Sequence, residues 1–243
     1  MRISFGKGNH MKKIGIIGAM EVEVAQLKAE MEQQKSLEYA GMVFLEGALE
    51  GHEVVVVRSG IGKVNAAICT QILADKFQVD VIINTGIAGS LKAEINIGDI
   101  VISTDVVHHD MDATGFGYPL GQVPQMKVFS FQASEKLRKL AKEVCERVNP
   151  EISVFEGRVV SGDQFISDRA RKESIGATFG GFCTEMEGVA IAQAAYLNDI
   201  DFVIIRAISD KADDSANMDY ETFEKMAIEH SVRLTRGFVG ALD

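Results

Sequence analysis

Short apolar runs dominated by Ile and Val recur along the chain, with helical patterns between them. The runs predict strands at 14–17, 54–57, 79–83, 100–102, 159–160 and 202–205. Several runs are continuous rather than alternating, which is typical of strands that helices cover on both faces. The sequence therefore predicts a layered α/β domain whose binding sites lie at the carboxyl ends of its strands.

Three segments place apolar residues on one helical face. These faces are formed by Val64, Ala67, Ile68 and Ile72, by Leu137, Leu140, Ala141 and Val144, and by Phe223, Ala227, His230, Leu234 and Phe238. A fourth helix is predicted to start at 185–187 and to run to about Asn198. Segment 108–126 shows neither the helical nor the strand pattern of apolar residues, which predicts a long loop. The aromatic residues of this loop favour contact with a partner or a ligand.

The length of the chain, 243 residues, suits a single domain, and no Pro- or Ser-rich linker divides it. We expect one domain over residues 12–243. Residues 1–11 are largely polar and precede the first strand pattern, so we expect a flexible leader or a cloning remnant there.

Charge and cysteine content narrow the function classes. The formal net charge is -10 and no basic patch is visible, which argues against a nucleic-acid partner. Cys69, Cys145 and Cys183 are too few and too widely spaced for a disulfide framework or a CxxC pair, so a reducing cytoplasm fits. No apolar run approaches the roughly 18 residues of a membrane span, and no signal peptide is visible.

Gly-rich turns follow three of the predicted strands, at 18–20, 59–63 and 85–89. Glycine lets a backbone approach a ligand closely, although each turn taken alone is equally explained by tight strand-to-helix packing. None of the turns completes the GxGxxG or GxxxxGK[ST] pattern, so the turns do not indicate a binding site for a dinucleotide or a nucleoside triphosphate. Together the three turns favour a ligand site at this edge of the sheet.

Acidic residues stand where strands or Gly-rich turns end: Glu21, Glu23, Glu185, Glu187 and Asp210. The helix dipole explains an acid in a first turn, and Asp210 could be a helix N-cap or an ion-pair partner of Arg206. Such an array also suits cleavage of a glycosidic bond, in which one acid protonates the leaving group and another carboxylate activates water. The acids alone do not name the substrate.

Six ordered motifs resemble those of the 5'-methylthioadenosine/S-adenosylhomocysteine nucleosidases of the nucleoside phosphorylase superfamily. They are IGIIGAMEVE at 14–23, SGIGKVN at 59–65, TGIAG at 85–89, VSGDQFI at 160–166, EME at 185–187 and RAISD at 206–210. The match runs from about Met11 to the C-terminus. The resemblance implies a three-layer α/β sandwich with a central mixed sheet flanked by helices.

The same resemblance implies hydrolysis of the bond between adenine and a 5'-thio-substituted ribose, without a metal or redox cofactor, in methionine salvage. The substrates would be 5'-methylthioadenosine and S-adenosylhomocysteine, with 5'-deoxyadenosine as a further candidate. By position, Asp210 would protonate adenine N7, and Ser209 would orient Asp210. Glu23 would be the base for the attacking water.

Further positions carry binding roles by the same resemblance. Glu187 would bind the ribose hydroxyls and Met186 would pack on the sugar. Phe165 would stack on adenine, and the backbone of Ile166 would read the edge of the base. Glu185 belongs to the same acidic motif, and either it or Asp163 would pair with Arg206.

The pocket for the 5'-substituent would be apolar and shared between two subunits of a homodimer. One subunit would supply Met20, Ile61, Tyr220 and Phe223, and its neighbour would supply Phe116, Tyr118 and Pro124 from segment 108–126. Three positions depart from the pattern: Ile87 replaces a frequent Ser, Gly188 a usual Ala and Tyr220 a frequent Phe. Ile87 removes a polar contact and Tyr220 adds a hydroxyl, so substrate preference is left open.

Other hypotheses remain at this stage. A nucleoside phosphorylase is disfavoured because the arginines that hold phosphate in related enzymes are absent, although Arg58 and Lys63 lie nearby. Two further hypotheses are a hydrolase of adenosine-like intermediates in menaquinone synthesis and a nucleoside-binding protein without enzymatic activity.

Three further features are interpreted as structural. His108, His109 and Asp110 are adjacent and cannot all converge on one metal as a helical HxxxH pair does. Cys183 lacks a visible base, and His230 stands on an apolar helical face.

Overall fold

The computed structural model describes residues 12–213 and 216–242, so the leader predicted at 1–11 lies outside the described residues. The strands are β1 (Ile14–Gly18), β2 (Glu32–Tyr39), β3 (Met42–Leu49), β4 (His52–Arg58), β5 (Val81–Ser90), β6 (Ile100–His108), β7 (Phe131–Gln132), β8 (Val154–Ser161), β9 (Cys183–Glu185) and β10 (Asp201–Asp210). The α-helices are α1 (Glu21–Glu30), α2 (Lys63–Ile72), α3 (Glu135–Val148), α4 (Arg169–Phe179), α5 (Gly188–Leu197) and α6 (Ala216–Val239).

The described strands form one mixed sheet in the order β10-β6-β8-β9-β5-β1-β4-β3-β2, with β7 on β6. Because β10 also pairs with β5, the strands β5, β10, β6, β8 and β9 close into a ring at one end of the sheet. The neighbours of β1 are parallel to it, and so is β10 to β5. The carboxyl ends of β1, β5 and β10 therefore meet at one edge.

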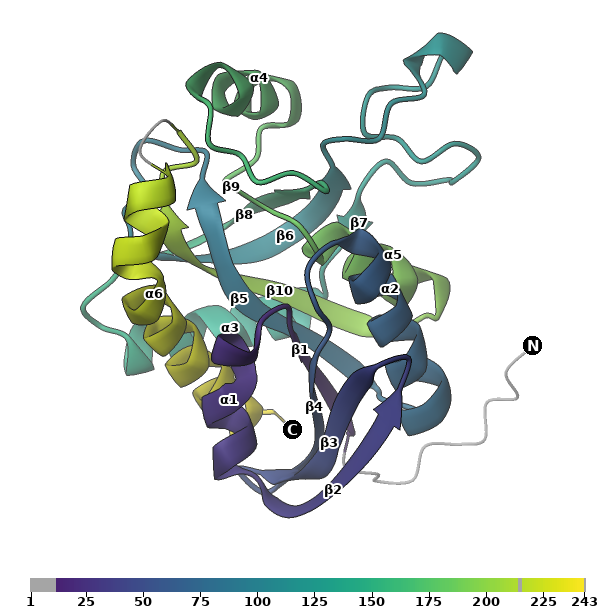
Figure 1. Ribbon diagram of the computed structural model, residues 1–243, viewed down its shortest axis with the longest axis vertical. Coiled ribbons are helices and arrows are strands. Elements are labelled where there is room, and N and C mark those ends of the chain that lie inside the picture. Colours follow the sequence, from purple (N-terminus) through teal and green to yellow (C-terminus); the bar gives the residue numbers. More distant parts are fainter. Residues whose placement is uncertain (1–11, 214–215, 243) are drawn as a thin grey trace.

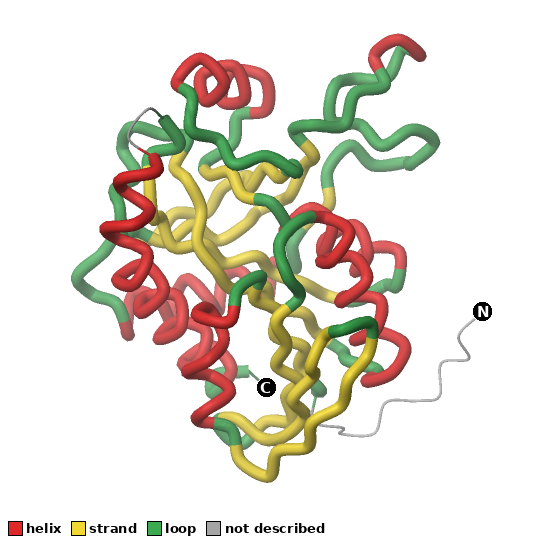
Figure 2. The backbone as a smooth tube through the Cα atoms, in the orientation of Figure 1, coloured by secondary structure: helices red, strands yellow, loops and turns green. Residues whose placement is uncertain are grey.

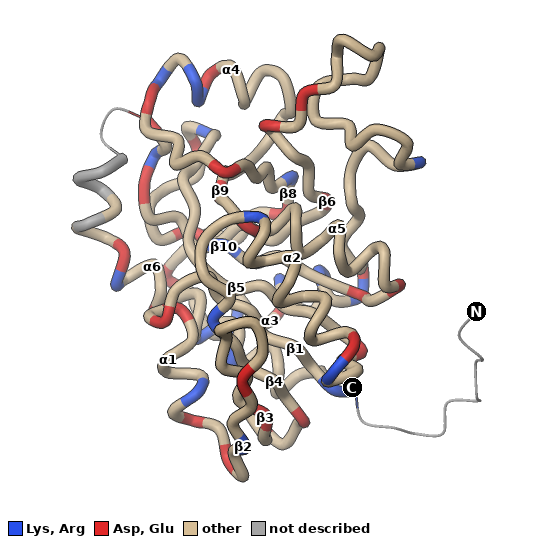
Figure 3. Tube along the Cα trace, turned by 45° about the vertical axis from the view of Figure 1, so that its right-hand side comes forward, with Lys and Arg blue, Asp and Glu red and all other residues tan. Residues whose placement is uncertain are grey.

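Helices cover both faces of this sheet (Figures 1 and 2). One apolar core lies between the sheet and helices α1, α3 and α6, and a second lies between the sheet and helices α2 and α5. The predicted three-layer α/β fold is confirmed. In the part of the chain that the structure describes, no helix is both long and apolar enough to cross a membrane. Lysines and arginines are scattered among acidic residues along the trace (Figure 3).

The strands that sequence patterns identified are those buried on both faces. Strand β1 has every residue buried, and β5 and β10 are almost as completely covered. The predicted strand at 79–83 begins instead at Val81, with Val79 and Asp80 preceding it. Strands β2 and β3 were not predicted, since β2 is polar and largely exposed (EQQKSLEY), and β7 and β9 are too short to show a period.

Helix α2 packs in an orientation that its apolar pattern did not indicate. Ala66, Cys69 and Thr70 are its buried residues. Of the predicted apolar face, Ala67 and Ile72 pack against the core, whereas Val64 is 69% exposed and Ile68 is 41% exposed. The face that helical spacing identified thus contacts the core along one side and is exposed along the other.

Candidate active site

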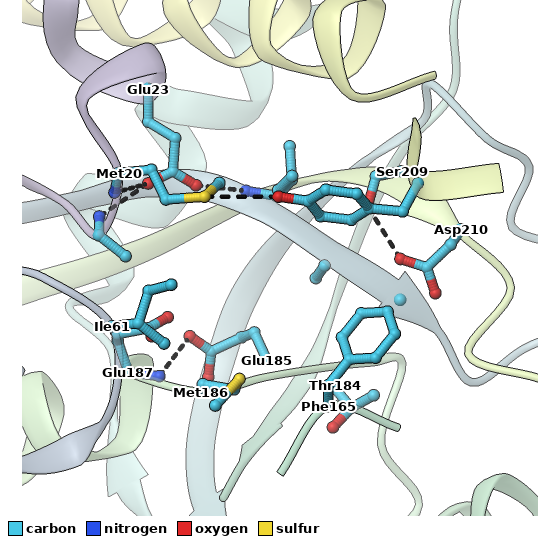
Figure 4. A pocket seen from close by; sticks show the side chains of 15 residues that line it. Met20, Glu23, Ile61, Phe165, Thr184, Glu185, Met186, Glu187, Ser209 and Asp210 are labelled. Atoms are coloured by element: carbon cyan, nitrogen blue, oxygen red, sulfur yellow. Dashed lines mark hydrogen bonds between the residues drawn. The ribbon is translucent and has the colours of Figure 1, made fainter. Parts of the chain in front are cut away.

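A cavity of about 420 Å³ opens where the carboxyl ends of β1, β5 and β10 meet the start of α5. Figure 4 shows it from close by, with Glu23 and Glu187 toward one end and Asp210 and Phe165 toward the other. The lining residues are Ala19, Met20, Glu23, Ile61, Ile87, Ala88, Gly89, Phe165, Thr184, Glu185, Met186, Glu187, Ser209, Asp210 and Tyr220. Residues that lie far apart in the sequence are therefore brought together at the predicted edge of the sheet.

Glu23 stands in the first turn of α1, and its carboxylate is fixed by backbone donors. Oε2 accepts hydrogen bonds from the N–H groups of Ala19 (2.7 Å) and Met20 (2.9 Å), and Oε1 accepts one from Ile87 (3.2 Å). Burial nevertheless raises the pKa of Glu23, against the lowering effects of Arg206 and these N–H groups. A carboxyl group with a raised pKa in a cavity is suited to accept a proton.

Gly86 explains why the chain carries a Gly-rich turn here. A Cβ atom at Gly86 would lie 2.5 Å from Glu23 Oε1, which no side chain could tolerate without displacing the carboxylate. The glycine therefore lets the backbone of β5 approach Glu23 closely enough for Ile87 N–H to bond to it.

Arg206 on β10 is a fully enclosed cation, 2% exposed, that bonds to the lining residue Glu185. Its Nη2 lies 2.5 Å from Glu185 Oε2 and also bonds to Asn84. Glu185 in turn accepts hydrogen bonds from Gly188 N–H (2.7 Å), Glu187 N–H (3.1 Å) and Ser161 Oγ. Three partners for Arg206 are considered from the sequence, Asp163, Glu185 and Asp210, and the structure selects Glu185.

Glu187 extends from the start of α5 toward Gly62, whose N–H donates to Glu187 Oε1 at 2.8 Å. Burial and repulsion by Glu185 raise the pKa of Glu187 well above its usual range, and Arg206 opposes this. Three buried carboxyl groups thus share one buried guanidinium. This balance lets Glu187 hold a proton more readily than a surface glutamate does.

Asp210 ends β10 at the other end of the cavity and is 2% exposed. Its Oδ1 accepts a hydrogen bond from Ala212 N–H (2.7 Å), and its Oδ2 accepts one from Ser209 Oγ (2.9 Å). Both oxygens are therefore oriented by close neighbours in the chain. Arg206, a partner considered from sequence, bonds to Glu185 instead.

Apolar and aromatic side chains cover the mouth of the cavity. Phe165 is half-exposed and makes an edge-to-face contact with Tyr220, with ring centroids 6.1 Å apart. Tyr220 donates its hydroxyl hydrogen to Glu224 at 2.8 Å, and the same oxygen lies 3.4 Å from Met20 Sδ. Phe165 also lines the cavity, and an aromatic ring in a cavity wall is suited to stack on a flat ligand.

Five predicted residues are not among the described lining residues of this cavity. Ile166 packs in a separate apolar cluster beside Ile175 and Phe179, and Phe223 is only partly buried. Phe116, Tyr118 and Pro124 lie on the loop after β6, which projects away from the body of the domain (Figure 1). Phe116 is 87% exposed.

Sequence reasoning missed four lining residues, namely Ala19, Ala88, Gly89 and Thr184. Ala19, Ala88 and Gly89 belong to the Gly-rich turns already singled out, so the turns carried the signal while the individual small residues did not. Thr184 lies next to the acidic motif, and its hydroxyl is buried without a partner.

No group of three or more His, Cys, Asp or Glu residues within 12–213 and 216–242 is arranged to hold a metal ion. His230 Nδ1 is paired with Gly98 O at 2.9 Å, as a structural histidine would be. Cys183 is fully buried, and burial raises the pKa of its thiol far above the usual range.

Replacing Arg206 with Met is expected to destabilise the fold, because Glu185 would remain buried without its cation. Breaking a buried pair in this way costs about 3–5 kcal/mol. The measurement is the free energy of unfolding in urea. Arg233→Met is the matched control, since Arg233 forms a 2.6 Å pair with Glu151 in which both side chains are more than 40% exposed, and such pairs contribute at most about 1 kcal/mol. Equal unfolding free energies for the two variants would contradict the assignment.

Comparisons with known proteins agree with this geometry. A family model described as the Phosphorylase superfamily matches residues 13–240. A 5'-methylthioadenosine/S-adenosylhomocysteine nucleosidase of Exiguobacterium is 44% identical over 232 residues, which cover 95% of this chain and 99% of the relative.

Solved structures share the fold of this chain along nearly its whole length. A nucleosidase of the same name from Colwellia psychrerythraea, in complex with adenine, has a TM-score of 0.91 at 41% identity, covering 95% of this chain and 96% of the other. A futalosine hydrolase of Helicobacter pylori has a TM-score of 0.90 at 33% identity, covering 96% and 99%. The chain therefore belongs to the phosphorylase superfamily and, within it, to the 5'-methylthioadenosine/S-adenosylhomocysteine nucleosidases, which are N-glycosidic bond hydrolases.

Proposed function

We propose that this chain hydrolyses the N-glycosidic bond of 5'-methylthioadenosine and S-adenosylhomocysteine, releasing adenine and a 5-thioribose product. The observation that carries the proposal is the separation of two fixed carboxyl groups, Glu23 and Asp210, toward opposite ends of one cavity. One end suits a purine, since Asp210 and Phe165 lie there. The other suits a sugar and a water molecule, since Glu23 and Glu187 lie there.

The leaving group requires a proton. Adenine departs with the electron pair of the bond between ribose C1' and N9, and protonation at N7 makes the departing base neutral. Asp210, oriented by Ser209 Oγ and Ala212 N–H, is the acid that supplies this proton. Phe165 holds the plane of the base by stacking.

The nucleophile is water, which adds its oxygen to C1' and gives one proton to Glu23. The sugar develops oxocarbenium character in the transition state, and a carboxylate in a water-poor cavity stabilises that positive charge. The hydrogen bonds from Ala19, Met20 and Ile87 hold Glu23 in place for both roles. Glu187 binds the ribose hydroxyls, and Glu185 positions Arg206 and the start of α5.

Water rather than phosphate is the nucleophile that this cavity favours. None of its described lining residues is a lysine or an arginine. Arg58 is exposed, and Lys63 pairs with Asp110 at 2.6 Å. A phosphate dianion would meet buried carboxyl groups without a free cation to balance them.

The test is release of the free base from four nucleosides in phosphate-free buffer: adenine from 5'-methylthioadenosine, S-adenosylhomocysteine and 5'-deoxyadenosine, and hypoxanthine from futalosine. We expect the first two to be the best substrates by kcat/KM. Base release from futalosine alone would instead place the chain with the Helicobacter pylori hydrolase in substrate choice.

A second copy of the chain completes the site in this proposal. The face formed by Ile61, Val64 and Ile68 is apolar and exposed, and Phe116 stands on a projecting loop at 87% exposure. Apolar surface gathered in this way is typical of a protein interface. A homodimer would cover the face, and Phe116, Tyr118 and Pro124 of each subunit would line the 5'-substituent pocket of the other.

Replacing Ile68 with Asp is expected to convert the dimer to a monomer and to raise KM for 5'-methylthioadenosine, because a charge would be buried at the interface. Sedimentation equilibrium measures the first effect and steady-state kinetics the second. Val43→Asp is the control, since Val43 is 48% exposed on β3 and lies outside this face. A dimer that persists in Ile68→Asp with unchanged KM would refute the shared site.

We also propose a reducing location, the cytoplasm. This is supported by Cys69, Cys145 and Cys183, which are buried and free. Burial raises the pKa of the Cys145 thiol to about 11, so it stays protonated and unreactive.

A further inference from the structure

Three loops at the mouth of the cavity are tied together by two aspartates. Asp163 Oδ1 accepts a hydrogen bond from Lys63 N–H at 2.8 Å, and Asp163 N–H donates to Asp110 Oδ2 at 2.9 Å. Lys63 Nζ closes the triangle on Asp110 Oδ1 at 2.6 Å. The three residues follow β4, β6 and β8, so these bonds join segments that are far apart in the sequence.

Two of these loops carry residues that line the cavity, Ile61 and Phe165. Ile61 lines the cavity, and Gly62 N–H holds Glu187 Oε1. Phe165 comes two residues after Asp163. Asp110 and Asp163 are themselves absent from the described lining residues, so they act on the site only through the residues beside them.

The chemistry of the triangle favours a fixed geometry. Gly62 at the N-cap of α2 has no side chain, and the Asp163 carboxylate supplies the acceptor at the start of that helix instead. Partial burial raises the pKa of Asp110, but the hydrogen bonds from Lys63 and from Asp163 N–H together lower it by a larger amount. The net pKa is below the ordinary aspartate value, so the carboxylate is ionised. Charge-assisted bonds of this kind are stronger than neutral ones.

Close packing between the loops after β6 and β8 also supports a fixed geometry of the triangle. A Cβ atom at Gly162 would lie 2.3 Å from His109 Cε1 and 2.9 Å from Asp110 Cγ. The loop after β8 therefore sits directly on the loop after β6, and Gly162 permits that approach.

We propose that Asp163 and Asp110 are positioning residues that hold Phe165 over the adenine end of the cavity. The inference rests on the proposed function, because it assigns the ring of Phe165 to a purine. The hydrogen-bonded triangle fixes the backbone from which that ring projects. A loop without these bonds would leave Phe165 to be ordered by the ligand, and adenine would bind more weakly.

The experiment is a double-mutant cycle on adenine affinity, measured by calorimetry with Asp163→Ala, Phe165→Ala and the double variant. We expect Asp163→Ala to raise the Kd for adenine about tenfold, within the range of one lost base-stacking contact. The double variant should bind no more weakly than Phe165→Ala alone, because both changes remove one interaction. Asp163→Asn keeps an acceptor for Lys63 N–H and should restore most of the affinity.

Losses that add in the double variant, or an unchanged Kd in Asp163→Ala, would overturn the proposal. Glu151→Gln is the control for removing a carboxylate from an ion pair, since its 2.6 Å bond to Arg233 lies on the surface and outside the cavity lining. Amide hydrogen exchange of residues 162–166 provides a readout without ligand: Asp110→Asn should accelerate exchange there, and unchanged exchange would also overturn the proposal. This second readout keeps the inference testable if wild-type protein fails to bind adenine, which would count against the proposed function alone.

Discussion

Replacing Glu23 with Gln is expected to reduce kcat for 5'-methylthioadenosine by about 10²- to 10⁴-fold, the usual contribution of a general base. Glutamine is close in size but cannot take a proton from water. It also offers one oxygen to three N–H donors, which the carboxylate satisfies with two. Single-turnover kinetics measures the chemical step directly.

The same variant should leave adenine affinity nearly unchanged, because Glu23 lies toward the sugar end of the cavity. A parallel loss of adenine binding would indicate a disturbed pocket rather than a lost base. Near-normal turnover would remove Glu23 from the role of base.

The pH dependence of the wild-type enzyme follows from the raised pKa of Glu23. A base must be deprotonated to act, so kcat/KM should fall as the pH is lowered through this pKa. Because burial shifts the pKa upward, the fall should begin above the ordinary glutamate value of 4.5. The residual activity of Glu23→Gln should lack this limb.

Replacing Asp210 with Asn is expected to cause a loss of similar size, about 10²- to 10⁴-fold in kcat, for a different reason. Asparagine keeps one oxygen that can accept the hydrogen bond from Ala212 N–H, and its NH2 group can donate to Ser209 Oγ in place of the bond that Asp210 accepts, so the local structure should persist. It cannot deliver a proton to adenine N7, and the bond to C1' would have to break toward an unprotonated purine.

The identity of the leaving group separates this role from a structural one. A nitrophenyl riboside has a leaving group that is stable as an anion and needs no proton. We expect Asp210→Asn to lose far less activity toward such a substrate than toward 5'-methylthioadenosine. Equal losses on both substrates would show that Asp210 does not act as the acid. Ser209→Ala should also lose more activity toward 5'-methylthioadenosine than toward the nitrophenyl riboside, but both losses should be smaller than those of Asp210→Asn.

The fold could be predicted where burial leaves a clear pattern. β1 and β10 are covered on both faces, so their Ile and Val runs identify them. β2 is almost wholly exposed and polar, and it is held by pairing with β3 rather than by burial, so its composition resembles a loop. Helical spacing correctly grouped the apolar residues of α2 on one side of the helix. Periodicity alone does not show whether that side packs on the core or is exposed at the surface.

The candidate site was predictable to the extent that motifs mark the ends of strands. Glu23, Glu187 and Asp210 share one cavity because the carboxyl ends of β1, β5 and β10 share one edge of the sheet. The ion pair between Arg206 and Glu185 could not be predicted from the sequence. The two residues are 21 positions apart, and their spacing gives no distance between their side chains. The triangle of Lys63, Asp110 and Asp163 joins three separate loops and left no signal in the sequence.

The most direct test of the account is the identity of the sugar product formed from 5'-methylthioadenosine in the presence of phosphate. Water attack on C1' leaves a free reducing sugar, whereas phosphate attack leaves a sugar 1-phosphate that does not reduce. We predict one equivalent of reducing 5-methylthioribose for each adenine released, at a rate independent of phosphate. A sugar 1-phosphate product, or release that requires phosphate, would contradict hydrolysis at this site.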